Sequence, residues 1–148
     1  MSTVHCQLAV PEGELFEEAV ITGFAFHRTP TGENSAVLED VTVRIGVAGG
    51  QELGRDFGRN SASLATVLEA GNLSVAADDD GMVVFTLDTP WEYPGGDLLL
   101  DIRFGGVSGY LYVWGWSAPG RRYVSSRDLL ARQGTVSELM PAVTLITR

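Results

Sequence analysis

The sequence predicts an all-β fold, a two-sheet antiparallel β-sandwich that is jelly-roll-like. Short segments alternate apolar and polar residues, as strands with one buried face do. The chain also contains 18 glycines and 6 prolines, many of them in clusters that suit tight turns. With 148 residues, 45% of them hydrophobic, it is long enough to bury a core as a single domain, residues 1–148. Cys6 is the single cysteine, so packing must supply the stability without an internal disulfide.

Three strands are expected in the first third of the chain. In the second of them, alternate residues should share one face, namely Val20, Thr22, Phe24 and Phe26. The Pro- and Gly-containing stretch Thr29–Asn34 predicts a turn. The three expected strands are Val4–Val10, Phe16–Phe26 and Leu38–Val47.

The middle of the chain contains one ambiguous segment, Ala62–Ala70. Its apolar residues have helical spacing, with Gly71 as a C-cap, but the segment also fits an extended strand, which we favour. A separate short strand is expected at Leu73–Ala76. A turn at Asp78–Gly81 and a strand at 83–87 follow.

The clearest strand lies after a Pro- and Gly-rich entry that begins at Thr89. From Leu98 to Phe104, every second residue is apolar, whereas Asp101 and Arg103 fall on the opposite face. This pattern is typical of a half-buried strand. The remaining expected strands are Tyr110–Trp116, Arg122–Ser125 and Val143–Thr147.

Three segments resemble a known bacterial module when they are taken in order. Ile21–Arg28 is similar to an "ITGxAFR" strand, Val41–Gly46 to "VxIRLG", and Pro90–Phe104 to "PFxYxxGNLLLDIR". These patterns belong to the β-sandwich module of PEP-CTERM-type exported surface proteins. The resemblance implies a sandwich fold and transfers no catalytic residues. It does not extend to the leader or the sorting tail of those proteins, so it does not carry over their location.

Composition argues against several classes of partner. The formal net charge is −9, and all ten basic residues are arginines without a basic stripe. Such a chain is a poor candidate for binding nucleic acid or an anionic membrane. No apolar run reaches the length that spans a bilayer, and the start at Met1 lacks a signal-peptide pattern. We therefore expect neither nucleic acid nor membrane as a partner.

One strand is unusually rich in aromatic residues. On an extended chain four of them share a face, namely Tyr110, Tyr112, Trp114 and Trp116. If the opposite, aliphatic face packs on the core, the aromatic face becomes a surface for sugar rings or another subunit. The alternative, which is the commoner arrangement in proteins, is that the aromatic face is itself the core.

Two clusters of charge are candidate binding features. Asp78 and Asp80 are weak candidates for holding calcium, because consecutive carboxylates point in different directions and a solvated turn explains them better. Arg121 and Arg122, with Arg127 nearby, form a local basic patch in an acidic chain. An acidic protein surface, including that of a neighbouring copy, would complement this patch, although solubilising loop charge is the simpler explanation.

The residues that could perform catalysis lack a supporting pattern, so we expect no enzyme and no required cofactor. His5 and Cys6 are adjacent on a strand and point to opposite faces, so His5 cannot serve as a base for Cys6. We expect Cys6 to be a buried, inert thiol. Ser125, Ser126 and Ser137 lack a nucleophile-elbow setting. Carboxylate pairs such as Asp101 with Glu92 have no feature that sets a glycosidase separation.

These observations lead to a prediction of a structural role. We expect a non-enzymatic assembly protein that packs against copies of itself or a larger particle, most specifically a virion component such as a capsid decoration, fibre or tail protein. The terminal segments Val4–Val10 and Val143–Thr147 are the natural strands to pair with a neighbour. The alternatives are a carbohydrate-binding or adhesion module that uses the aromatic strand, and a subunit of a bacterial extracellular filament or surface layer. The expected location is the virion or the extracellular space.

Overall fold

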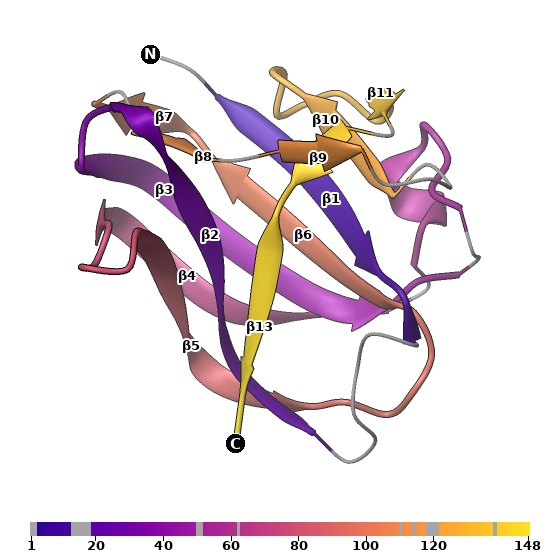
Figure 1. Ribbon diagram of the computed structural model, residues 1–148. Helices are drawn as coiled ribbons and strands as arrows, with labels where there is room; N and C mark the ends of the chain where they lie inside the picture. Colours follow the sequence, from indigo (N-terminus) through magenta and orange to yellow (C-terminus); the bar gives the residue numbers. More distant parts are fainter. Residues whose placement is uncertain are drawn as a thin grey trace.

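Two antiparallel sheets face each other in the computed structural model, which confirms the all-β sandwich (Figure 1). The structure describes residues 3–12, 19–49, 52–61, 63–109, 111–113, 115–117, 122–137 and 139–148; for 111–113, 115–117 and 139–140 it describes the backbone alone. The strands are β1 (Val4–Val10), β2 (Val20–Gly32), β3 (Ser35–Val47), β4 (Leu64–Ala76), β5 (Met82–Glu92), β6 (Leu98–Phe104), β7 (Gly106–Ser108), β8 (Leu111–Val113), β9 (Gly115–Ser117), β10 (Tyr123–Ser126), β11 (Thr135–Ser137), β12 (Leu139–Pro141) and β13 (Val143–Thr147). A 3-10 helix, η2, spans Phe57–Arg59.

The larger sheet has seven strands and places the first strand near its middle. Its order is β11-β10-β1-β6-β3-β4, and β7 pairs with β3. β1 pairs with β10 on one side and with β6 on the other. The expectation that Val4–Val10 could pair with a neighbouring molecule is therefore wrong, because both of its edges are already hydrogen-bonded within the sheet.

The smaller sheet has the order β13-β2-β5, and β8 pairs with β2. A register shift in β2 between Ile21 and Gly23 changes which side chains face the core. Ile21 is fully buried, whereas Thr22 is half-buried, so the expected face that combined Thr22 with Phe24 is wrong. Gly23 is required at the shift, because a Cβ there would lie 2.6 Å from the carbonyl oxygen of Phe85.

The space between the sheets is filled by apolar side chains. Phe24 stacks on Phe85 with ring centroids 4.9 Å apart, and Phe26 meets both rings edge-on. The facing side of the larger sheet contributes alternate residues of β1, β6 and β3, among them Leu8, Leu100 and Ile45, all fully buried. This alternation is the pattern that the sequence showed in Leu98–Phe104.

A second, smaller apolar cluster lies on the outer face of the larger sheet. Ala9, Leu99 and Val124 belong to it, and Leu53 and Phe57 cover them. Both covering residues belong to the connection between β3 and β4, of which the structure describes residues 48–49 and 52–61; we call these residues the cover segment. Both faces of the larger sheet are therefore buried in this region, whereas the sequence pattern predicted one buried face.

Three local expectations differ from the structure. The turn expected over Thr29–Asn34 is shorter, because β2 continues to Gly32. For the segment expected at Ala62–Ala70, the extended form is confirmed over Leu64–Ala70, whereas Ala62 lies outside the described residues. No break follows, since β4 continues to Ala76 and its pairing with β3 keeps the same register on both sides of Gly71. Of the strand expected at Tyr110–Trp116, the structure describes β8 and β9, and Tyr110 and Trp114 lie outside the described residues; β8 pairs with β2, whereas β9 pairs with β12.

Candidate functional site

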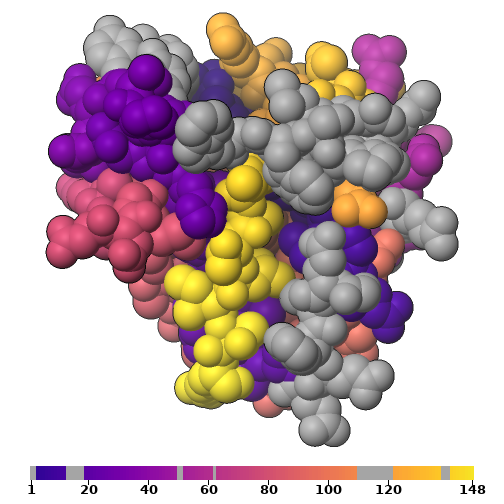
Figure 2. Space-filling view, viewed as in Figure 1, coloured from indigo at the N-terminus to yellow at the C-terminus, as the bar shows by residue number. Residues whose placement is uncertain are grey.

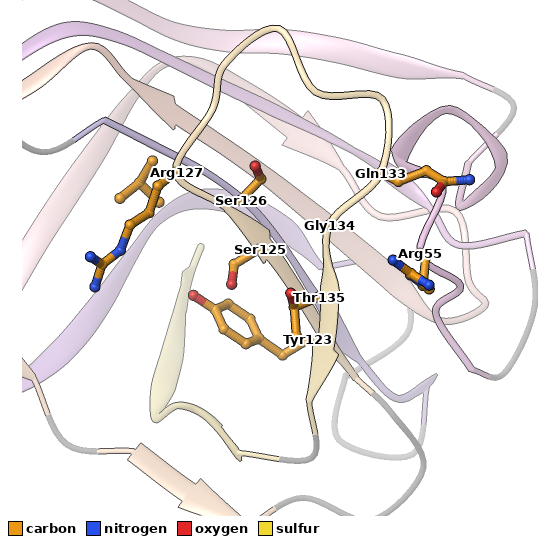
Figure 3. Close-up of a pocket in the computed structure, with 9 residues that line it drawn as sticks. Arg55, Tyr123, Ser125, Ser126, Arg127, Gln133, Gly134 and Thr135 are labelled. Atoms are coloured by element: carbon orange, nitrogen blue, oxygen red, sulfur yellow. The ribbon is translucent and has the colours of Figure 1, made fainter.

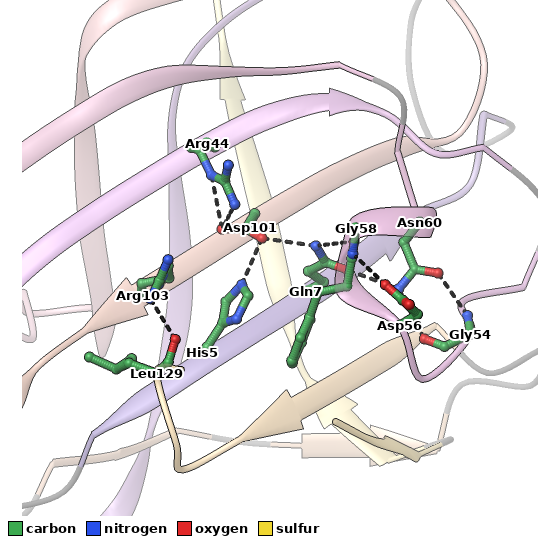
Figure 4. Close-up of polar contacts among 11 residues, drawn as sticks. His5, Gln7, Arg44, Gly54, Asp56, Gly58, Asn60, Asp101, Arg103 and Leu129 are labelled. Carbon is green, nitrogen blue, oxygen red and sulfur yellow. Dashed lines mark hydrogen bonds and ion pairs between the residues drawn. The ribbon is translucent and has the colours of Figure 1, made fainter. Parts of the chain in front are cut away.

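A row of polar side chains crosses the outer face of the larger sheet (Figure 4). In the strand register, Gln7 of β1 lies opposite Asp101 of β6, which in turn lies opposite Arg44 of β3. His5 lies two residues before Gln7 and therefore on the same face. Together with Asn60 of the cover segment they form what we call the buried polar cluster.

Asp101 is the centre of the buried polar cluster. Its Oδ2 atom lies 2.8 Å from His5 Nε2 and accepts a hydrogen bond of 2.8 Å from Gln7 Nε2. Its Oδ1 atom lies 3.2 Å from Arg44 Nη2 and 3.3 Å from Arg44 Nε. Burial by itself raises the pKa of Asp101, but the hydrogen bonds from His5 and Gln7 and the charges of His5 and Arg44 outweigh it, so the pKa is lowered. The carboxylate is therefore held in its charged form.

Polar contacts also fasten the cover segment to the sheet. Asn60 Nδ2 donates to Gln7 Oε1 at 2.9 Å, and Gln7 Nε2 lies 3.2 Å from the carbonyl oxygen of Phe57. The Phe57 ring stacks on His5 with centroids 3.9 Å apart. Within the segment, Asp56 caps η2 by accepting from Gly58 N at 3.0 Å. The cluster thus links β1, β3, β6 and the cover segment.

The His5–Asp101 pair has the orientation of a base and its positioning carboxylate, but it is closed to a substrate. Asp101 can only accept, so His5 donates from Nε2, and its Nδ1 atom is buried without a hydrogen-bond partner in the described part of the chain. His5 is 4% exposed and lies beneath Phe57. A general base must come within hydrogen-bond distance of its substrate. The arrangement therefore suits holding the cover segment in place.

Cys6 lies on the other face of β1 from His5, as expected from strand geometry. It is buried as a free thiol in the core between the sheets. Burial raises the pKa of the Cys6 thiol to about 12, with a hydrogen bond to Tyr123 acting in the opposite direction and the charge of Asp101 adding to the rise. The thiol is protonated at neutral pH, which makes it a poor nucleophile.

The β10–β11 hairpin presents a different kind of feature, an exposed leucine on an ordered turn. Ser126 Oγ accepts from Asp128 N at 3.0 Å, and Asp128 Oδ1 accepts from Leu130 N at 2.9 Å. Arg103 Nη2 donates to the carbonyl oxygen of Leu129 at 2.7 Å, which ties the turn to β6. The side chain of Leu130 is 90% exposed. The turn thus holds Leu130 out toward solvent.

The structure places only some of the residues predicted from the sequence. Tyr110, Trp114 and Arg121 lie outside the described residues, and for Tyr112 in β8 and Trp116 in β9 only the backbone is described. β8 pairs with β2, whereas β9 pairs with β12.

Arg122 is half-buried, and its carbonyl oxygen accepts from Ala9 N at 2.9 Å. Arg127, in contrast, is exposed on the β10–β11 hairpin. The basic patch expected from adjacent positions in the sequence therefore contains side chains in different environments.

The predicted calcium candidates form a turn that is capped by the chain itself. Asp78 Oδ1 accepts backbone hydrogen bonds of 2.9 Å from both Asp80 and Met82. Within the described ranges, no group of three or more His, Cys, Asp or Glu side chains is arranged to hold a metal ion. The geometry of Asp78 is that of a turn-stabilising carboxylate.

The sequence reasoning missed the buried polar cluster and the exposed Leu130. Asp101 and His5 were recognised as polar residues on strands, but their meeting depends on the register of β1 against β6. The Ser126–Asp128 spacing is a local turn signal that could have placed Leu130 at a turn. Its exposure could not be inferred from that signal.

None of the described segments forms a helix with the length and hydropathy needed to cross a membrane. No family model, curated protein or solved structure matches this chain.

Proposed function

We propose that this protein is a non-enzymatic assembly module that packs against copies of itself or a larger particle. The observation that carries the proposal is Leu130, which is 90% exposed on an ordered turn of the β10–β11 hairpin. Burying a leucine side chain contributes roughly 1.5–3 kcal/mol. Because hydrogen bonds already fix the turn, little conformational entropy is lost when a partner covers it.

A second feature supports assembly, namely the position of the C-terminal strand. Within the described part of the chain β13 pairs with β2 alone, so it forms an edge of the smaller sheet. In the space-filling view β13 lies at the surface (Figure 2). An edge strand offers backbone donors and acceptors to a strand of a neighbouring molecule.

Within this class, we favour a virion component, such as a capsid decoration, fibre or tail protein, located on the virion or in the extracellular space. Such proteins function by repeated contacts between small, stable domains. The buried polar cluster supports this role, because it stabilises the sheet on the side that the sandwich core does not cover.

The test is the mass of the protein in solution, measured by light scattering over a range of concentrations. We expect the wild type to form a defined oligomer or polymer, and Leu130→Ser to shift the association to at least tenfold higher concentration. Val84→Ser is the matched control, because Val84 is also an exposed aliphatic residue, at 42%, but lies on β5. A wild-type protein that is monomeric at every concentration would contradict self-assembly.

A further inference from the structure

A hollow of about 590 Å³ lies beside the β10–β11 hairpin (Figure 3). We infer that it binds an acidic oligosaccharide, that is, a short sugar chain that bears carboxylates. We call the hollow the hairpin groove; it is lined by Val4, Arg55, Tyr123, Ser125, Ser126, Arg127, Gln133, Gly134 and Thr135. Its volume falls in the range of roughly 300–1,000 Å³ that is typical of small-molecule sites.

The strand register builds the floor of the hairpin groove. Tyr123 and Ser125 are two residues apart on β10 and share a face, and Thr135 of β11 lies opposite Ser125. Figure 3 shows Arg127 on one side of this group, and Arg55 with Gln133 on the other. A phenol ring and two hydroxyl groups thus lie between two guanidinium groups.

The charge of the groove favours an anion. Arg55 and Arg127 are both exposed, and neither forms a salt bridge with any residue that the structure describes. None of the nine lining residues is acidic, although the whole chain has a net charge of −9. A planar guanidinium recognises a carboxylate through two parallel hydrogen bonds. The two arginines therefore fit a ligand that carries carboxylates.

The polar lining favours a sugar over a peptide. Among the described lining residues Val4 is the one with an aliphatic side chain, whereas seven others carry a hydroxyl, amide or guanidinium group. A peptide that docks in a groove normally needs pockets for apolar side chains. A carbohydrate instead needs many hydrogen bonds and one aromatic ring such as that of Tyr123, which is apolar on its face and polar at its tip.

Hydrogen bonds to the backbone hold the two sides of the hairpin groove in place without a ligand. Gly134 N donates to the carbonyl oxygen of Arg55 at 2.8 Å, and Phe57 N donates to that of Arg132 at 3.1 Å. On the other side, Thr3 Oγ1 donates to the carbonyl oxygen of Arg127. The cover segment and the hairpin are thus joined along one side of the groove. A preformed site loses little entropy on binding.

The test is calorimetric titration of the full chain with trigalacturonate at low salt. We expect binding that is weakened at least tenfold by Arg55→Ala and by Arg127→Ala, since each change removes a charge-assisted contact. Arg132→Ala is the matched control, because Arg132 is an exposed arginine of the same hairpin that does not line the groove. It should leave the affinity within twofold. Circular dichroism melting of each variant confirms the fold.

Three results would overturn the inference. One is the absence of trigalacturonate binding at millimolar concentration. Another is equal affinity for the neutral cellotriose, which would show that the charges of the two arginines do not contribute to binding. The third is equal or tighter binding of triglutamate, which would identify an acidic peptide as the ligand. Repeating the titration with Leu130→Ser separates this inference from the proposed assembly, because Leu130 does not line the groove.

Discussion

The two faces of the seven-stranded sheet are both buried in the region of β1, β6 and β3, but by different means. The inner face packs apolar residues such as Leu8 and Leu100 against the phenylalanines of the smaller sheet. The outer face buries Asp101, with no exposed surface, among His5, Gln7 and Arg44. Apolar packing tolerates replacement by residues of similar volume, whereas a buried charge requires its specific partners. The outer face should therefore be the more sensitive to single substitutions.

The largest effect is expected from Asp101→Ala. The change leaves His5, Gln7 and Arg44 without their shared acceptor and should lower the free energy of unfolding by about 3–5 kcal/mol. Urea denaturation measures the change. Asp79→Ala is the control, because Asp79 lies in an exposed turn, and it should stay within about 0.5 kcal/mol of the wild type. Equal stability of the two variants would contradict the expectation that the outer face of the seven-stranded sheet is sensitive to single substitutions.

Phe57→Ala tests whether the cover segment can open by itself. The ring stacks on His5, and its loss should cost about 3 kcal/mol, toward the low end for a phenylalanine because the surface segment can relax. Hydrogen exchange should increase mainly in residues 52–61. Phe85→Ala, in the sandwich core, should instead raise exchange throughout both sheets. Identical exchange patterns would show that the cover segment and the sheets unfold as one unit.

A pair of glycines tests how closely the chain entering β4 approaches β3. A Cβ on Gly46 would collide with the carbonyl oxygen of Ser63, so Gly46→Ala should cost about 1–3 kcal/mol. Gly71 lies on β4 with no atom within 4 Å of an added Cβ, so Gly71→Ala should be neutral or slightly stabilising. Thermal melting compares the two. Equal losses would contradict the tight approach at Gly46.

The two faces should also differ in their dependence on pH. Asp101 has a lowered pKa when folded, so its contribution is present above its ordinary value of 3.8 and is lost as the pH falls through the folded value. Cys6 has a raised pKa, so its contribution is present below 9.0 and is lost as the pH rises toward about 12. Each group changes stability by at most about 1.4 kcal/mol per pH unit.

Stability measured from pH 2 to 12 checks both effects. Asp101→Asn should mainly weaken the acid dependence, and Cys6→Ala should mainly weaken the alkaline one. Asp101→Asn should change the alkaline limb only slightly, because the charge of Asp101 is the smallest contribution to the raised pKa of Cys6. A Cys6→Ala variant with an unchanged alkaline limb would place that dependence on another group, such as Tyr123, whose pKa burial also raises.

Local patterns of apolar and polar residues were enough to predict the all-β class and most strand positions. In Val4–Val10 and Leu98–Phe104, every second residue is apolar. This alternation can be read from the local sequence without knowing which elements pack against the strand. The inert Cys6 also followed from that alternation, because its face is the apolar one. The break expected between Ala70 and Leu73 is absent, because cross-strand pairing with β3 keeps the chain extended through Gly71, a residue of low strand propensity.

The buried polar cluster and the hairpin groove, in contrast, arise from contacts between distant parts of the folded chain. Gln7, Arg44, Asn60 and Asp101 come from four separate segments, and they meet because the register of three strands and the path of the cover segment bring them together. In the same way, Arg55 and Arg127 flank one groove although 72 positions separate them in the chain. A local sequence pattern does not predict contacts between residues so far apart in the chain, because strand register and long-range contacts depend on the whole fold.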